Sequence, residues 1–417
     1  MRGFLALALL LGLAWGQESL EALLVLKEEV IEGGELRTYT GLQRYSVASE
    51  AELKALLKKL SRPPSPPRFV FGEGGWRGVE KKGLLFDEKE ALAAYREARA
   101  SGRKSFRLPV RHIPPSLSLK DLYALGVREH LATGETDFRG SSRARAHNLL
   151  LASSRLDGLL IPPGPFSFNR ALGPITQEAG YQEAFVIVGD RTEQDLGGGV
   201  CQVSTTLFRA FFFAGLPILE RHAHSYQVAY YRPPGLDAAV FQPHKDLKVL
   251  NDTPGHILVQ RSVVGTKLRF YLFGTKDREV RYEGPVITDR KPPLPPQEIP
   301  DPSLPLGARK QVDFPAEGAR VVWRRAVRYG DGRVREDQVV SVYRPWGAVY
   351  LVGPRPEEPA APPALQAGGG GAPAPRPLPR GGGEGSALRQ VDDQLPLQKE
   401  VEGALPALFR PLQGVGL

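Results

Sequence analysis

Residues 197–215, GGGVCQVSTTLFRAFFFAG, constrain the fold of this chain more than any other stretch. The three glycines allow a tight turn and bring backbone N–H groups close to a bound anion or oxyanion. The apolar residues after them recur at helical spacing, and Gly215 with Pro217 supplies a helix stop. The stretch therefore predicts a tight turn that leads directly into an apolar helix.

Cys201, the one cysteine among 417 residues, falls in the first turn of that predicted helix. A helix N-terminus favours a thiolate, and the N–H groups of Gly198, Gly199 and Cys201 are placed to stabilise a developing oxyanion. This pattern is typical of an acyl-transfer nucleophile. The alternative is a buried structural cysteine, which is the commoner fate of a lone Cys.

The first 16 residues have the features of a secretory signal peptide: Arg2, an apolar run from Phe4 to Trp15, and small residues at Ala14 and Gly16. We expect cleavage near Gly16 and a protein that works outside the cytoplasm, in the cell envelope, the periplasm or the medium. The apolar run is too short to span a bilayer, and we expect no membrane span after cleavage. An unpaired thiol in an exported protein favours a reactive role for Cys201.

The chain carries 55 Lys and Arg against 46 Asp and Glu, a net charge of +9. This balance suits an anionic partner such as a cell-wall surface. The sequence contains no recognised nucleic-acid-binding motif, and an exported protein has little access to nucleic acid, so we expect no such partner.

The predicted fold class is α+β with several domains, because one core seldom grows past roughly 250–300 residues. Capping boxes at Ser49–Glu52 and Asp87–Glu90 predict two helices in the first part, and Gly330–Gly332 predicts a hairpin near the end. After the signal peptide (1–16) we expect an α+β module (17–140), a mixed α/β domain (141–275), a proline-rich linker (276–308), a small β-rich domain (309–354) and a disordered Pro/Gly-rich tail (355–417).

Two histidines follow the cysteine helix, at positions 222 and 224. Residues 219–231 read as a strand, in which His222 and His224 point to the same side. A thiolate that attacks an amide needs a partner to hold or take a proton, so either histidine is a candidate base.

Several separated motifs resemble, in the same order, those of the VanW family of bacterial envelope proteins. The resemblance spans residues 141–273 and rests on these motifs: Phe166-Ser-Phe-Asn169, Gly173-Pro174, Gly180-Tyr181, Gly197 to Thr206, His222-Ala-His-Ser225 and Lys245-Asp-Leu247. Residues 17–140 look like the wall-binding module that often precedes VanW domains. Residues 309–353 look like the small β-rich domain, named for its glycines, that often follows them.

The resemblance implies a role in peptidoglycan metabolism, with a link to glycopeptide (vancomycin) resistance. Some VanW-domain proteins are understood to be L,D-transpeptidases that form an acyl-enzyme on the cysteine of the glycine-rich motif, which is Cys201 here. The better-known Ser-His-Gly-Cys signature of other L,D-transpeptidases is absent. The implied protein is a cysteine-dependent, L,D-transpeptidase-like acyl transferase that acts on stem peptides of peptidoglycan, without cofactor or metal.

In this hypothesis Cys201 is the nucleophile and His224, whose neighbour Ser225 continues the motif, is the preferred base over His222. Gly198 and Gly199 supply the oxyanion donors. Asp237, Lys245 and Asp246 are candidates either to orient a histidine or to grip a substrate carboxylate. The full set of substrate-binding candidates is Asn169, Ser204, Ser225, Asp237, Lys245 and Asp246.

Two other functions remain open from the residues alone. Cys201, His222 and His224 are legitimate zinc ligands that leave one open position, as in a zinc-dependent hydrolase, although the usual metal-binding spacings are missing. A non-catalytic wall-binding scaffold, with Cys201 merely packed, also fits the basic charge and the flanking modules.

Overall fold

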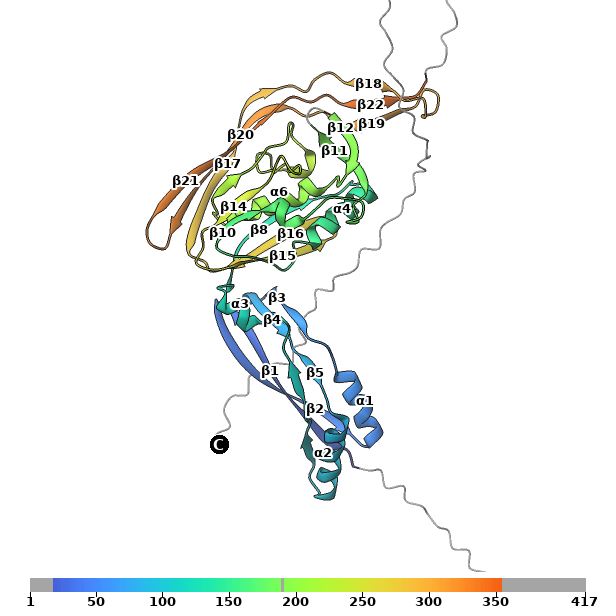
Figure 1. Ribbon diagram of the computed structural model, residues 1–417, viewed down its shortest axis with the longest axis vertical. Helices are drawn as coiled ribbons and strands as arrows, with labels where there is room; N and C mark the ends of the chain where they lie inside the picture. The colour runs from blue at the N-terminus through green and yellow to red at the C-terminus, as the bar shows by residue number, and fades with distance from the viewer. Residues whose placement is uncertain (1–17, 189–190, 355–417) are drawn as a thin grey trace, which may run out of the picture.

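The computed structural model describes residues 18–188 and 191–354, whose arrangement is shown in Figure 1. The predicted signal peptide and the predicted tail lie outside the described residues. The described part is an α+β structure with several separate sheets, which confirms the predicted fold class. None of its helices is both long enough and apolar enough to cross a membrane.

The N-terminal part is built on a long antiparallel hairpin. Leu20, Leu24 and Leu26 alternate inward along its first strand and pack against leucines of two helices. Those helices begin at the predicted capping residues Ser49 and Asp87. The elements are β1 (Leu20–Glu32), β2 (Glu35–Val47), α1 (Glu50–Leu60), β3 (Ser65–Gly72), β4 (Gly75–Lys81), β5 (Gly83–Leu85), α2 (Glu88–Ala100), β6 (Ser105–Arg107), β7 (Arg111–Ile113) and α3 (Leu119–Ala124).

The main sheet of this part has the order β2-β1-β4-β3, with β6 added parallel to β1. The segment from Phe106 to His112 is divided between two short strands, β6 and β7. Pro109 separates them because proline cannot donate a hydrogen bond to a sheet.

The central part places one helix, α6, against a four-stranded antiparallel sheet of order β8-β16-β15-β9. A second sheet has the order β10-β14-β13, and β11 pairs with β12. The elements are β8 (Glu129–Asp137), α4 (Arg143–Ser154), β9 (Leu159–Ile161), β10 (Gly164–Ser167), α5 (Phe168–Leu172), β11 (Glu183–Val188), β12 (Arg191–Leu196), α6 (Val200–Phe213), β13 (Ile218–Glu220), the 3-10 helix η1 (Ala229–Tyr231), β14 (Lys248–Asn251), β15 (Ile257–Val264) and β16 (Lys267–Gly274).

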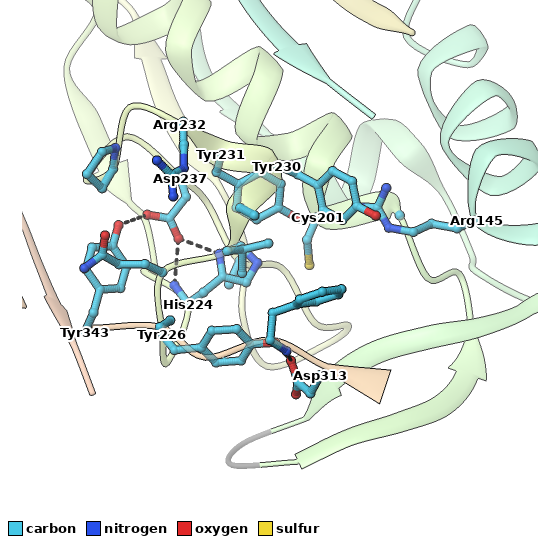
Figure 2. Close-up of a pocket in the computed structure, with 18 of the residues that line it drawn as sticks. Arg145, Cys201, His224, Tyr226, Tyr230, Tyr231, Arg232, Asp237, Asp313 and Tyr343 are labelled. Carbon is cyan, nitrogen blue, oxygen red and sulfur yellow. Dashed lines mark hydrogen bonds and ion pairs between the residues drawn. The ribbon is translucent and has the colours of Figure 1, made fainter. Parts of the chain in front are cut away.

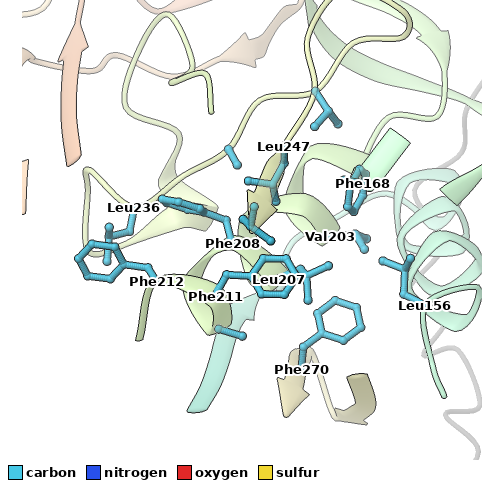
Figure 3. Close-up of a cluster of buried hydrophobic side chains, with 14 of the residues drawn as sticks. Leu156, Phe168, Val203, Leu207, Phe208, Phe211, Phe212, Leu236, Leu247 and Phe270 are labelled. Atoms are coloured by element: carbon cyan, nitrogen blue, oxygen red, sulfur yellow. The ribbon is translucent and has the colours of Figure 1, made fainter. Parts of the chain in front are cut away.

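Helix α6 is the predicted cysteine helix, and it forms the middle of the largest core. Val203, Leu207, Phe208, Phe211 and Phe212 are fully buried among residues from the surrounding strands and loops (Figure 3). Each such side chain stabilises the fold by about 1.5–3 kcal/mol through the apolar surface it removes from water. A helix packed on so many sides holds its N-terminus, and therefore Cys201, in a fixed place.

The C-terminal part consists of two three-stranded sheets of order β17-β20-β21 and β18-β22-β19. Arg325 on β20 donates to the carbonyl oxygens of Phe212 (2.6 Å) and Leu216 (2.7 Å), at and just beyond the C-terminal end of α6. This is the end at which a positive charge is favoured. The strands are β17 (Arg278–Lys291), β18 (Gln297–Pro300), β19 (Arg309–Asp313), β20 (Gly318–Tyr329), β21 (Val334–Tyr343) and β22 (Val349–Val352).

The segment expected to be a linker, 276–308, instead contributes two strands to these sheets, β17 and β18. The prolines that suggested a linker are concentrated near residues 292–296, whereas the residues before them include Val280, Tyr282 and Ile287. Side chains of this kind favour strands. Strand β17 pairs along β20, the first strand of the predicted hairpin.

The strand predicted over residues 219–231 is wrong. Only Ile218–Glu220 (β13) is regular, and η1 occupies residues 229–231. Between them the chain bends, because His224 N–H donates to the Asp237 carboxylate (2.8 Å) instead of to a neighbouring strand. The two histidines therefore do not share one face.

A close approach of α6 to β8 depends on Gly134. A Cβ atom on this glycine would lie 2.0 Å from the Thr206 carbonyl oxygen of α6. Both partners are backbone, so neither can move without shifting the helix against the sheet.

We predict that Gly134→Ala lowers the free energy of unfolding by about 1–3 kcal/mol or more, as overpacking of a core does. Gly74→Ala is the matched control, since an added Cβ there meets nothing within 4 Å. Chemical denaturation of both variants checks this. Equal stabilities would contradict the close approach.

Candidate active site

The glycine turn fixes the start of α6 beside a cleft. Gly197 (φ 81°) and Gly199 (φ 108°) adopt left-handed backbone that glycine alone takes without strain. A Cβ on Gly199 would also lie 2.8 Å from the Arg145 carbonyl oxygen. Cys201 follows as the second residue of the helix and is half-buried.

Of the two glycines expected to supply oxyanion donors, Gly199 lines the cleft together with Cys201. N–H groups at this end of a helix have no acceptor within the helix itself. Gly198 is buried, and its carbonyl accepts a hydrogen bond from Asn148 Nδ2 (3.1 Å). The main-chain donors at the cleft are therefore those of Gly199 and Cys201.

The cleft in front of Cys201 has a volume of about 1390 Å³. Its walls come from the glycine turn, from residues 224–245, and from the C-terminal part through residues 312–317 and Tyr343. Figure 2 shows Cys201 between the His224 ring on one side and Arg145 on the other. The cysteine thus opens onto a space shared by the central and C-terminal parts.

His224 is buried and held by Asp237 at two points. Its backbone N–H donates to Asp237 Oδ2 (2.8 Å), and its Nδ1 lies 2.5 Å from the same oxygen. An ionised carboxylate can only accept, so Nδ1 carries the proton and Nε2 is left for the sulfur of Cys201. Cys201 Sγ donates to the Val240 carbonyl oxygen (3.4 Å), and Cys201 and His224 each shift the pKa of the other. Cys201, His224 and Asp237 form a continuous chain of interacting side chains.

Asp237 is itself fixed from the C-terminal part of the chain. Its other oxygen, Oδ1, accepts hydrogen bonds from Tyr343 OH (2.6 Å) and Arg221 Nη2 (2.9 Å). Burial raises the pKa of Asp237, but the hydrogen bond and charge of His224, the charge of Arg221 and the Tyr343 hydroxyl hold it well below its usual range. Asp237 is therefore ionised at neutral pH.

The charges around Cys201 and His224 favour a thiolate and an imidazolium. Burial raises the pKa of Cys201, but the hydrogen bond and charge of His224, with a smaller effect of Arg145, bring it below its ordinary value. Burial lowers the pKa of His224, yet its bonds to Asp237 and Cys201 raise it to about 9. Between these two pKa values the ion pair is the stable form.

The loop that carries Asp237 is anchored by the buried Arg209 of α6. Its guanidinium donates to five carbonyl oxygens at 2.6–3.2 Å, namely those of Glu135, Tyr231, Arg232, Pro233 and Leu236. Ser204, a substrate-binding candidate, is also buried and donates to the Ala238 carbonyl oxygen (2.6 Å). Both side chains of α6 thus support the loop and do not line the cleft.

The other substrate-binding candidates divide between the cleft and the interior. Lys245 is exposed and lines the cleft. Asn169 and Asp246 do not line the cleft. At the start of α5, the backbone N–H of Asn169 donates to Asp246 Oδ1 (2.9 Å). Ser225 is also outside it, and its carbonyl accepts from Arg344 N–H (2.8 Å). Asp237, the remaining candidate, orients His224.

His222 lies apart from Cys201 and His224. Its Nε2 contacts Glu220 Oε1 (3.0 Å), its side chain is 39% exposed, and it does not line the cleft. The three ligands of the zinc alternative are therefore not brought together. Within the described ranges, no group of three or more His, Cys, Asp or Glu side chains is arranged to hold a metal.

Sequence reasoning missed four residues around the site: Arg145, Arg209, Arg221 and Tyr343. Arg209 had a usable signal, because a lone charge inside the apolar run LFRAFFF needs buried acceptors. Tyr343 lies 106 positions after Asp237 and carried no signal of its own.

The two histidines allow a matched test of the thiolate. In the wild type, alkylation of Cys201 by iodoacetamide should reach half its maximal rate below the ordinary cysteine pKa of about 8.5. His224→Ala removes the hydrogen bond and charge that lower the pKa but leaves the burial that raises it, so the midpoint should move to higher pH. His222→Ala should leave the profile unchanged. Equal effects of both changes, or a thiol inert until denaturation, would contradict this geometry.

Comparison with known proteins gives a family for the central region. Residues 144–273 match the family model described as VanW like protein. The chain is 33% identical over 175 residues to the "Uncharacterized protein YoaR" of Bacillus subtilis, covering 42% of this chain and 57% of that protein. It is 31% identical over 146 residues to the "Vancomycin B-type resistance protein VanW" of Enterococcus faecalis, covering 33% of this chain and 52% of that protein.

The matched part spans about half the length of these curated relatives. No solved structure matches the chain. The family match covers Cys201, His224 and Asp237 together, but not Tyr343. Residues 144–273 of this chain form a VanW family domain.

Proposed function

We propose that this chain is a cysteine-dependent acyl transferase of the cell envelope, which cross-links peptidoglycan stem peptides in the manner of an L,D-transpeptidase. The observation that carries the proposal is the chain Cys201–His224–Asp237 at the edge of a large cleft. The pKa shifts of the three residues favour the protonation states that nucleophilic catalysis by a thiol requires. The VanW resemblance supports the peptide substrate and the site of action outside the cytoplasm.

In the first half-reaction the Cys201 thiolate attacks a peptide carbonyl of the donor. The carbonyl oxygen takes the negative charge and is stabilised by the N–H groups of Gly199 and Cys201. The tetrahedral intermediate then breaks its C–N bond, and His224 gives its Nε2 proton to the departing amine. The products are a thioester on Cys201, a free amine and a neutral imidazole.

In the second half-reaction an amine of a neighbouring stem peptide attacks the thioester. The neutral His224 accepts a proton from the attacking amine, and the C–S bond breaks to regenerate the thiolate and the imidazolium. Asp237 holds the ring in one tautomer throughout and remains ionised, as the acid of a catalytic triad does. The new amide bond is the cross-link.

Two further features support a role in the cell wall. The net charge of +9 favours an anionic polymer as the partner. One relative of the central domain is named as a vancomycin resistance protein, and we propose a role related to such resistance for this chain as well. Peptidoglycan is accordingly the proposed partner.

We predict an acyl-enzyme on Cys201. Intact-mass analysis after incubation with purified muropeptides should show a mass increase equal to the donor minus its leaving residue, and later a cross-linked product. Cys201→Ala should give neither species, whereas His222→Ala should give both, because His222 is outside the cleft.

Cross-linking by the Cys201→Ala protein would contradict the proposal. So would a wild type that is folded and reactive toward iodoacetamide yet forms neither adduct nor product with any muropeptide. Retention of sacculus binding in that case would favour the wall-binding scaffold.

A further inference from the structure

Arg145 of α4 presents a positive charge to the cleft without a carboxylate partner. Its Nη1 donates to Ser141 Oγ (2.6 Å) and its Nη2 to Gln202 Oε1 (2.8 Å), both neutral acceptors. The guanidinium also stacks over the Tyr230 ring at 4.0 Å. In the part of the chain that the structure describes, no carboxylate lies within ion-pairing distance of it. The guanidinium is thus held in one orientation, and its charge is available to a bound ligand.

Three other arginines close to the site have partners within the chain, and a fourth, Arg232, lines the cleft but is exposed. Arg221 pairs with Asp237 (2.9 Å), and Arg290 in the cleft wall pairs with Glu317 (2.9 Å). Arg209 is buried and donates its hydrogen bonds to backbone carbonyl oxygens. Arg145 differs from these three because it is half-buried, lines the cleft, and keeps unused N–H groups. A guanidinium has five N–H donors in a planar fork that fits a carboxylate.

Arg145 is also tied to the position of Cys201. Its backbone oxygen and Cγ lie against Gly199, and its charge reaches the thiol strongly enough to help lower the pKa of Cys201. Figure 2 places it across Cys201 from His224. A peptide whose carbonyl sits on the sulfur therefore has its neighbouring groups within reach of the guanidinium.

We propose that Arg145 is the binding site for a carboxylate of the donor peptide next to the bond that Cys201 cleaves. This inference deepens the proposed function and rests on it. Two carboxylates have this chemistry: the terminal one of the residue that leaves, and a side-chain one of the residue that is transferred. Asp195, Asp313 and Glu317 line the cleft, and so do the cations Arg232, Lys245 and Arg290. Among the cations of the cleft, Arg145 is the one whose charge acts on Cys201 and whose guanidinium is held by neighbouring side chains.

The first test uses two alkylating agents of similar size, anionic iodoacetate and neutral iodoacetamide. Their rate ratio on Cys201 does not depend on the thiolate fraction, which affects both reactions equally. Arg145→Gln should lower the iodoacetate-to-iodoacetamide ratio roughly fivefold, as expected for a charge several ångströms away at the edge of a protein. Arg170→Gln, the same change at an exposed arginine outside the cleft, should leave the ratio unchanged.

Arg145→Lys, measured in parallel, should keep most of the iodoacetate preference because it keeps the charge. An unchanged ratio in folded Arg145→Gln, with Cys201 still reactive, overturns the carboxylate site and leaves the proposed function standing. A folded wild type whose Cys201 reacts with neither agent overturns both.

The second test identifies the carboxylate without requiring turnover. A donor tetrapeptide should protect Cys201 from iodoacetamide, and the same peptide should be compared with its terminal carboxyl amidated and with its side-chain carboxyl amidated. The amidation that weakens protection at least fivefold in the wild type, but not in Arg145→Gln, identifies the group bound. If neither amidation weakens protection by the wild type, the proposal is wrong.

Discussion

The buried carboxylate of Asp237 is the interaction on which the rest of the site depends. Isolated in this interior it would be strongly unfavourable, so it exists only because His224, Arg221 and Tyr343 surround it with donors. These donors come from widely separated parts of the chain, and Tyr343 belongs to the C-terminal strands. The orientation of His224, and through it the charge of Cys201, therefore depends on the C-terminal part being packed in place.

Burial and neighbouring charges act in opposite directions on the pKa of Cys201, and their balance explains why this residue is half-buried. Burial disfavours a thiolate, while the imidazolium of His224 and the guanidinium of Arg145 favour it. A fully enclosed sulfur could not reach the substrate. A fully exposed one would interact more weakly with these charges, because water screens them more than the protein interior does. A half-buried cysteine at a helix N-terminus, on the edge of a cleft with a volume of about 1390 Å³, satisfies both needs.

The sequence predicted well those features that depend on neighbouring residues. The spacing of apolar residues predicted helix α6 and the place of Cys201 in its first turn, and the capping residues Ser49 and Asp87 predicted the starts of α1 and α2. Prediction failed where distant groups decide the conformation. His222 and His224 were placed on one face of a strand because alternation was assumed, but the bond from His224 N–H to Asp237 bends the chain between them. Asp237 and Asp246 were likewise indistinguishable until the fold brought only Asp237 to the ring, and Tyr343 could be assigned only from the fold.

We infer that His224, held by Asp237, keeps Cys201 as a thiolate at neutral pH. The most direct measurement is the ultraviolet absorbance of the thiolate, taken as the difference between the wild type and Cys201→Ala across a pH titration. We expect this absorbance to be present at neutral pH. Asp237→Asn removes the charge that supports the imidazolium, so this variant should show the absorbance only at higher pH. Absorbance that emerges only above about pH 8.5, and at the same pH in both proteins, would contradict this inference.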